Sequence, residues 1–205
     1  MKQRITSKTK GVIGVHLFGQ CYGTELIDLC EEHNLALIED AAQAHGASIV
    51  YNGASTMAGA LGTISCFSFF PSKNVAVGGE GGMITAAGPE IGARIKSVVD
   101  HGRDGSLQSQ EVGTNMRMSE VFAAIGRVQL KHLDDWLARR RSNAAMLSET
   151  VGSHPKLHAP QVRPDSQHAW HQYCLQTENV EAFLQHMATH DIDARRIYPV
   201  PCHQH

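Results

Sequence analysis

The strongest constraint on the fold is an apolar run, an amphipathic helix and a second apolar run in the first forty residues. Gly11 to Phe18 reads as a short buried strand, and Thr24 to His33 reads as a helix with one apolar face. Leu35 to Ile38 is continuously apolar. This order predicts a βαβ unit of a parallel sheet. Active sites in such sheets lie beyond the carboxyl ends of the strands, where Glu39 and Asp40 stand.

The rest of the chain continues this α/β pattern in two parts. We predict a strand over Cys66 to Phe70, a turn over Gly78 to Gly82, a strand over Met83 to Thr85, a helix over Pro89 to Val99, and one long helix from Ser119 to about Val151. After Gly152 we predict a Pro-rich connector over His154 to Ser166, a strand over Trp170 to Thr177, a helix over Val180 to Thr189, and an extended Arg195 to Tyr198. The chain is therefore predicted to divide into a larger part, 1–152, and a smaller part, 153–205.

Composition excludes several classes of protein. The chain is 42% hydrophobic and 19% charged with a formal net charge of -2, so neither disorder nor a general nucleic-acid or anionic-membrane surface is indicated. No apolar run reaches spanning length. Its five cysteines are an odd number without metal-type pairs, and we interpret them as reduced thiols of a cytoplasmic protein.

Asp40 has two interpretations. It follows Ile38 and Glu39 at the end of the second apolar run. An Asp in this position is typical of a helix N-cap. It is also typical of a carboxylate that faces the protonated ring nitrogen of pyridoxal phosphate, and Ala42 is small enough to let a flat ring approach the backbone.

Lys73 also has two interpretations. A solvated loop lysine is the ordinary one. However, the preceding residues are strongly aromatic, so the loop is expected to emerge from a core, with only Ser72 and Asn74 as polar company. A desolvated amine loses its proton more readily and attacks an aldehyde.

Six motifs in order make the chain resemble the DegT/StrS family of nucleotide-sugar aminotransferases. These are Val15-His16-Leu17-Phe18-Gly19-Gln20, Glu39-Asp40-Ala41-Ala42-Gln43-Ala44-His45-Gly46, Phe67-Ser68-Phe69-Phe70-Pro71-Ser72-Lys73-Asn74, Gly79-Glu80-Gly81-Gly82-Met83, Asn115-Met116-Arg117-Met118-Ser119-Glu120 and Tyr198-Pro199-Val200-Pro201. The resemblance covers nearly the whole chain. It implies the aspartate aminotransferase fold, with 1–152 as part of the large domain that binds pyridoxal phosphate and 153–205 as part of the small C-terminal domain.

The resemblance also implies roles for single residues. Lys73 would form the Schiff base with pyridoxal phosphate and act as acid and base in the proton shift. Asp40 would pair with the ring nitrogen, Gln43 would approach the ring hydroxyl and Ser68 would hold the phosphate. Asn115 would reach the phosphate of the neighbouring subunit's cofactor in a homodimer. A dehydrating branch of the family carries His in place of the lysine, so Lys73 favours transamination.

The chain departs from the family in length, since members are roughly twice as long. The missing N-terminal part carries a Gly/Ser/Thr phosphate loop and an aromatic residue that stacks on the cofactor. We therefore expect weak cofactor binding by this chain alone, and an oligomer or aggregate rather than a monomer because a sheet edge is exposed.

Three functions remain to be compared. The first is transamination of a nucleotide-linked keto-sugar with glutamate as donor, for polysaccharide or antibiotic biosynthesis. The second is an impaired remnant that folds or acts only by association. A dinucleotide-binding domain is disfavoured because the glycines at 78–82 do not fit its fingerprint. A metal site at His168, His171, Cys202, His203 and His205 is disfavoured because these residues lack paired spacing. His16 and His45 are interpreted as packing residues rather than substrate contacts.

Overall fold

The computed structural model describes residues 1–204, without the side chain of Cys202. The chain forms two compact units. The first comprises Met1–Arg141 and Val162–His171, and the second comprises Ser142–Gln161 and Gln172–His205. The division predicted at Gly152 stays a prediction. No helix within residues 1–204 combines the length and apolarity needed to cross a membrane.

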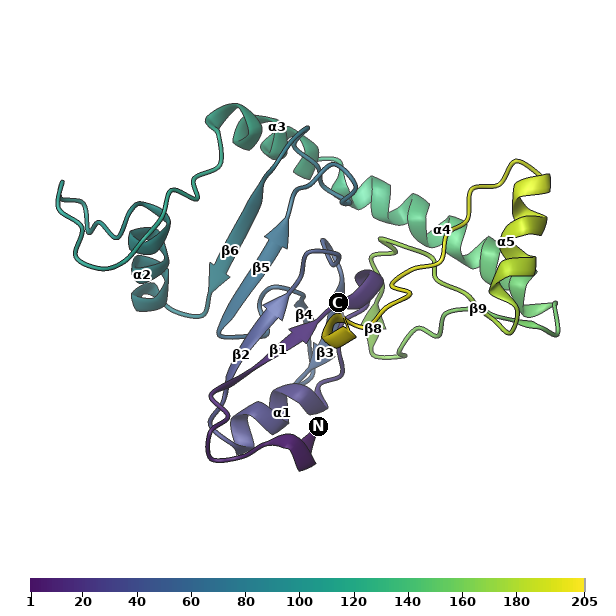
Figure 1. Cartoon of the computed structure of the whole chain (residues 1–205), viewed down its shortest axis with the longest axis horizontal. Helices are drawn as coiled ribbons and strands as arrows, with labels where there is room; N and C mark the ends of the chain where they lie inside the picture. The colour runs from purple at the N-terminus through teal and green to yellow at the C-terminus, as the bar shows by residue number, and fades with distance from the viewer. Residues whose placement is uncertain (205) are drawn as a thin grey trace. The chain divides into compact units, whose positions relative to one another are not determined.

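A four-stranded sheet organises the first unit (Figure 1). Its order is β1 (Gly11–Val15), β2 (Ala36–Asp40), β5 (Ile64–Ser68) and β6 (Gly82–Ala86). The first three strands run parallel and β6 pairs antiparallel to β5. Helix α1 (Glu25–Glu32) connects β1 to β2 and packs Ile27 and Cys30 against Leu37. The predicted βαβ unit is confirmed.

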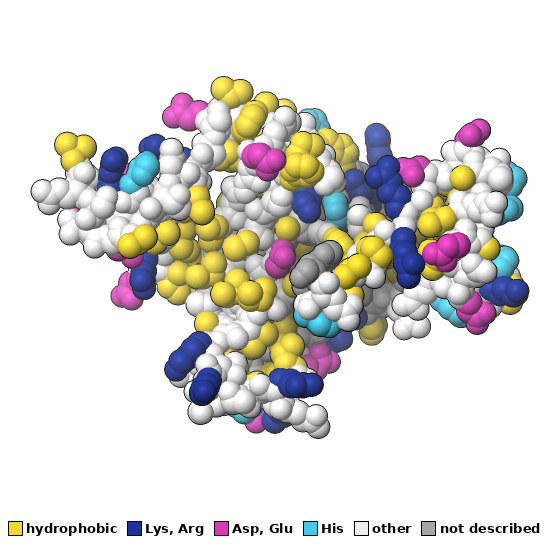
Figure 2. Space-filling view, viewed as in Figure 1, with side chains coloured by type: hydrophobic (Ala, Val, Ile, Leu, Met, Phe, Trp, Pro, Cys, Tyr) yellow, Lys and Arg dark blue, Asp and Glu magenta, His cyan; other side chains and the backbone are white. Residues whose placement is uncertain are grey.

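One face of this sheet is apolar and uncovered within the described chain. Ile13, Val15 and Ile84 point to that face and are 66%, 45% and 43% exposed. Figure 2 shows hydrophobic side chains gathered over the area of β5 and β6. The prediction of a buried strand over 11–18 was wrong in two respects: the strand ends at Val15, and its second face has no described element packed on it.

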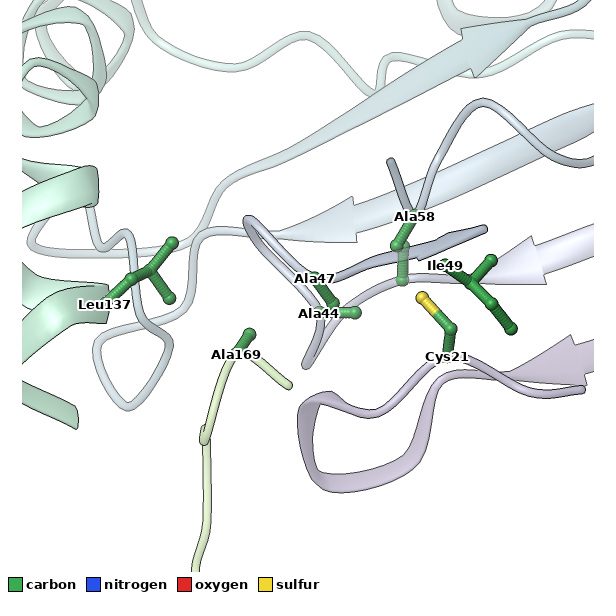
Figure 3. Packing of buried hydrophobic residues seen from close by; sticks show 8 residues of the cluster. Cys21, Ala44, Ala47, Ile49, Ala58, Leu137 and Ala169 are labelled. Carbon is green, nitrogen blue, oxygen red and sulfur yellow. The ribbon is translucent and has the colours of Figure 1, made fainter. Parts of the chain in front are cut away.

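The opposite face lies against a smaller sheet. Its order is β4 (Ala54–Met57), β3 (Ser48–Tyr51) and β8 (Ser166–Gln167), all antiparallel. A core cluster forms around this sheet, and Figure 3 labels seven of its members. They are Cys21, Ala44, Ala47, Ile49, Ala58, Leu137 and Ala169. Mostly small side chains allow the surrounding loops to approach one another closely.

The helices of the first unit partly match the prediction. Helix α2 (Pro89–Val99) has the predicted bounds. The single long helix was wrong, because α3 (Glu120–Leu130) and α4 (Leu133–Gly152) are separate. The amides of Lys131 and His132 donate to carbonyls three residues back, which tightens the turn and interrupts the α-helical ladder.

The second unit contains little regular structure besides its helices. Strand β7 (Leu157–His158) pairs with β9 (Gln176–Thr177), and α5 (Val180–Thr189) has the predicted bounds. The strand predicted over 170–177 was wrong apart from β9, because Trp170 adopts a left-handed φ of 49°. Tyr198 also has a φ of 49°, so the predicted extended run stops before it. Short 3₁₀ turns complete the chain at Lys2–Arg4, Leu17–Gly19 and Cys202–Gln204.

Candidate functional site

Asp40 ends β2 in the middle of the four-stranded sheet. Val15 and Cys66 are its register partners on the two neighbouring strands. One carboxylate oxygen accepts from the amide of Ala42 at 3.1 Å, which closes a local turn. No helix begins there, so the N-cap interpretation was wrong. The carboxylate lies on the uncovered face, near Cys66. Burial raises the pKa of the Cys66 thiol, and the negative charge of Asp40 also raises it.

Lys73 lies in the loop that follows β5. Its amide donates to the carbonyl of Phe70 at 2.9 Å. Both flanks of the loop are buried, because Phe69 is 6% exposed and Val75 and Val77 are inaccessible. Since β2 and β5 are parallel neighbours, the loops after Asp40 and before Lys73 leave the sheet at the same edge.

Two histidines lie close to the Lys73 amine. Burial, followed by the charges of His171 and Lys73, lowers the pKa of His45 to about 4. Burial, followed by the charges of Lys73 and Arg140, likewise lowers the pKa of His171 to about 4. Both imidazoles are therefore neutral at pH 7. Only Ser72 and Asn74 could be predicted as polar neighbours of Lys73, because distant residues that folding brings close have no local signal in the sequence.

Gln43 and Ser68 flank the same edge of the sheet. The side-chain oxygen of Gln43 accepts from the amide of Phe18 at 2.6 Å. The hydroxyl oxygen of Ser68, the last residue of β5, accepts from the amide of Phe70 at 3.3 Å. Both side chains and Ala42 are partly exposed, so all three remain accessible from solvent.

Asn115 lies in a different loop, between α2 and α3. Its backbone bridges to Asp100, and its side-chain oxygen accepts from Arg117 at 3.1 Å. Arg117 also pairs with Asp100 at 3.2 Å. Asn115 is exposed, and its role towards a neighbouring subunit stays a prediction.

Glu39, the neighbour of Asp40, has a purely structural environment. It is fully buried and accepts hydrogen bonds from His16, Ser65 and the amides of residues 59, 61 and 62. Burial alone would raise the pKa of Glu39, but these hydrogen bonds lower it to about 2. The packing interpretation of His16 is thereby confirmed, since its ring is inaccessible and lies 2.8 Å from Glu39.

An open hollow of about 770 Å³ lies apart from these residues, between α2 and the loop that follows it. Its basic side chains include Arg94 and Arg117, which are paired with Glu111 and Asp100. The hollow is lined by none of the predicted site residues.

Metal ligands are not assembled in the part of the chain that the structure describes. No group of three or more His, Cys, Asp or Glu is placed there to hold an ion. The side chain of Cys202 and all of His205 lie outside the described residues. Cys21, Cys30, Cys66 and Cys174 are free thiols.

Known sequences resemble this chain over its whole length. Residues 1–205 match the model of the DegT/DnrJ/EryC1/StrS aminotransferase family. The chain is 34% identical over 204 residues to dTDP-3-amino-3,4,6-trideoxy-alpha-D-glucose transaminase of Streptomyces venezuelae, covering 99% of this chain and 53% of the relative. It is 38% identical over 205 residues to dTDP-3-amino-3,6-dideoxy-alpha-D-galactopyranose transaminase of Aneurinibacillus thermoaerophilus, covering 100% and 55%. The chain spans about half the length of these curated relatives.

Solved structures confirm the predicted fold. S. venezuelae DesV in complex with a ketimine intermediate superposes with a TM-score of 0.92 at 33% identity, covering 100% of this chain and 54% of that one. An aminotransferase of the same family from Brucella abortus gives 0.88 at 27% identity, covering 96% and 52%. The α/β architecture is therefore that of part of a pyridoxal-phosphate aminotransferase.

Proposed function

Because the chain belongs to the DegT/DnrJ/EryC1/StrS aminotransferase family, we propose that it is part of an enzyme that transaminates a nucleotide-linked keto-sugar with pyridoxal phosphate as cofactor. Both curated relatives described above are named as transaminases of dTDP-amino sugars. The observation that carries the proposal is that Asp40 and the Lys73 loop follow adjacent parallel strands at one edge of the sheet. Glutamate is the proposed amino donor.

The residues at this edge fit the cofactor. Pyridoxal phosphate, when bound, supplies an electron sink for amine transfer. The Asp40 carboxylate, with one oxygen held by Ala42, is available to stabilise a protonated ring nitrogen. Ala42 would leave room for a flat ring, Gln43 would approach the ring hydroxyl, and Ser68 would hold the phosphate.

Lys73 is the proposed covalent anchor and proton carrier. A primary amine attacks an aldehyde only when it is deprotonated. The neutral imidazoles of His45 and His171 give this amine polar neighbours that carry no charge. The Lys73 amine would accept and return the proton that moves during transamination.

We further propose a homodimer with shared active sites, in which Asn115 contacts the cofactor phosphate of the other subunit. Helix α3 supports an association surface of this kind. Val121, Ile125 and Val128 lie on one side of it and are 66%, 38% and 54% exposed. Because the described cysteines are free thiols, we propose that the enzyme acts in the cytoplasm.

An alternative is favoured by the uncovered apolar face of the four-stranded sheet. A chain with Ile13, Val15 and Ile84 exposed is expected to associate with another polypeptide. In that case this chain is an impaired remnant that acts only in a complex.

Two measurements separate these functions. Purified chain is titrated with pyridoxal phosphate, reduced with borohydride and mapped by mass spectrometry, and its mass in solution is measured by sedimentation. A cofactor adduct on Lys73, followed by glutamate-dependent amination of a dTDP-linked keto-sugar, supports the enzyme. An adduct-free chain that binds only a partner polypeptide supports the alternative.

A further inference from the structure

Ala169 connects two loops of the proposed site through its backbone. It is fully buried and belongs to the core cluster of Figure 3. Its amide donates to the carbonyl of Gly19 at 2.7 Å. Its carbonyl accepts from the side-chain nitrogen of Asn74 at 2.9 Å, across 95 residues of sequence. The residue after Lys73 is therefore tied to the turn that contains Gly19.

That turn is in contact with Gln43. The amide of Phe18 donates to the side-chain oxygen of Gln43 at 2.6 Å. A Cβ atom on Gly19 would lie 3.1 Å from the Gln43 carbonyl oxygen and 3.0 Å from the amide nitrogens of Trp170 and His171. A continuous set of hydrogen bonds thus runs from Asn74 through residue 169 and the turn to Gln43.

Arg140 holds the rest of the same segment. One of its terminal nitrogens lies 2.8 Å from the carbonyl oxygen of Trp170 and 3.5 Å from that of His171. The amide of Trp170 donates to the His168 ring at 2.8 Å, and the two rings stack at 4.0 Å. Burial lowers the pKa of Arg140, and its guanidinium donates inside the protein to these carbonyls.

We propose that residues 168–171, the bridging segment, set the position of Lys73 relative to Asp40 and Gln43, with Asn74 and Arg140 as positioning residues. The proposal rests on the proposed role of Lys73 and deepens it. A lysine amine is carried on a flexible four-carbon stem, so its placement depends on how firmly its backbone is held. Misplacement by about 1 Å lowers reactivity by up to about a hundredfold.

Each variant removes the contacts of one side chain. Asn74→Ala deletes the donor to Ala169, and Arg140→Gln deletes the charged donor to Trp170. Arg140→Lys keeps a cationic donor and is the conservative rescue. Arg139→Gln is the matched control, because Arg139 precedes Arg140 on α4 and is exposed.

Each variant of the full chain is compared with the wild type by two measurements. The first is amide hydrogen exchange at residues 73 to 77, whose protected amides include Lys73 and Val77. The second is the rate at which pyridoxal phosphate becomes fixed to Lys73 by borohydride. We expect Asn74→Ala and Arg140→Gln to speed exchange and to slow attachment about tenfold. Arg140→Lys recovers most of the rate, and Arg139→Gln matches the wild type.

A double variant distinguishes positioning from a general loss of stability. Both side chains act through the bridging segment. The double variant Asn74→Ala with Arg140→Gln is therefore expected to attach pyridoxal phosphate only slightly more slowly than the more impaired of the two single variants. A lower melting temperature with wild-type attachment and exchange would show that these contacts serve stability alone and would overturn the proposal.

The outcome stays decisive if one part of the test fails. If wild-type Lys73 takes up no pyridoxal phosphate, the proposed function fails, and hydrogen exchange alone decides whether Asn74 and Arg140 fix the Lys73 loop. If Asn74→Ala does not fold, the three Arg variants decide the matter. Equal exchange and equal attachment in Arg140→Gln and Arg139→Gln would contradict the proposal.

Discussion

Glu39 and Asp40 are adjacent in β2, and the alternation of the strand sends them to opposite faces. Glu39 is buried among donors, whereas Asp40 lies on the uncovered face with one amide partner. The sequence located both carboxylates at the end of a strand. It did not separate their roles, because the donors to Glu39 come from residues 16, 59, 61, 62 and 65, which only the folded chain brings together.

This contrast predicts opposite outcomes for two conservative substitutions. Glu39→Gln is expected to destabilise the chain by about 3 kcal/mol, since several buried donors lose a charged acceptor. Asp40→Asn is expected to keep wild-type stability and to weaken pyridoxal phosphate binding. Urea unfolding measures the stability of both variants. Equal stability of the two variants would be incompatible with the buried network around Glu39.

His168 predicts a pH dependence of stability. Burial lowers its pKa from 6.5 to about 4, so the folded chain binds fewer protons than the unfolded chain between these values. Its contribution to stability is therefore complete above about pH 6.5 and is lost as the pH falls towards 4. His168→Asn retains an acceptor for Trp170 but does not titrate. Its unfolding free energy is expected to vary less across this window, whereas the exposed control His158→Asn should follow the wild type.

At the scale of elements, periodicity identified the helices at α1, α2 and α5 and the parallel pairing of β1 with β2. Periodicity did not predict the structure where the local backbone conformation departs from a regular helix or strand. The break between α3 and α4 involves neither Pro nor Gly, and the left-handed backbone of Trp170 interrupts what reads as a strand. Likewise, nothing near Lys73 in sequence announces the contact of Asn74 with Ala169.

Gly19 and Gly53 form a matched pair that tests the close packing of these turns. Both have positive φ, 104° and 78°, but a Cβ on Gly53 meets nothing within 4 Å. Gly53→Ala is expected to cost about 1 kcal/mol from backbone strain alone. Gly19→Ala is expected to cost clearly more, because its Cβ would also press on the backbone of Gln43 and the bridging segment. Denaturant unfolding compares the stability lost in the two variants. Equal losses of stability would argue against close packing at Gly19.

At the scale of the whole molecule, the uncovered sheet face predicts association in solution. Ile13→Glu together with Ile84→Glu is expected to reduce the oligomeric mass in sedimentation without lowering the melting temperature, because both side chains are exposed in the single chain. Leu107→Glu, at a loop residue 92% exposed, is the control and should leave the mass unchanged. A sharp wild-type monomer at tens of micromolar would contradict this prediction.

The family and the fold of the molecule could be predicted from six ordered motifs, although the chain is only about half as long as its curated relatives.

The most direct test of the central claim is the site of cofactor attachment. Pyridoxal phosphate is added at increasing concentration, the chain is reduced with borohydride, and modified lysines are mapped by mass spectrometry in the wild type and in Asp40→Asn. We predict that attachment is concentrated on Lys73 and is reduced in Asp40→Asn. Attachment spread evenly over exposed lysines such as Lys2 and Lys131, or unaffected by Asp40→Asn, would contradict it.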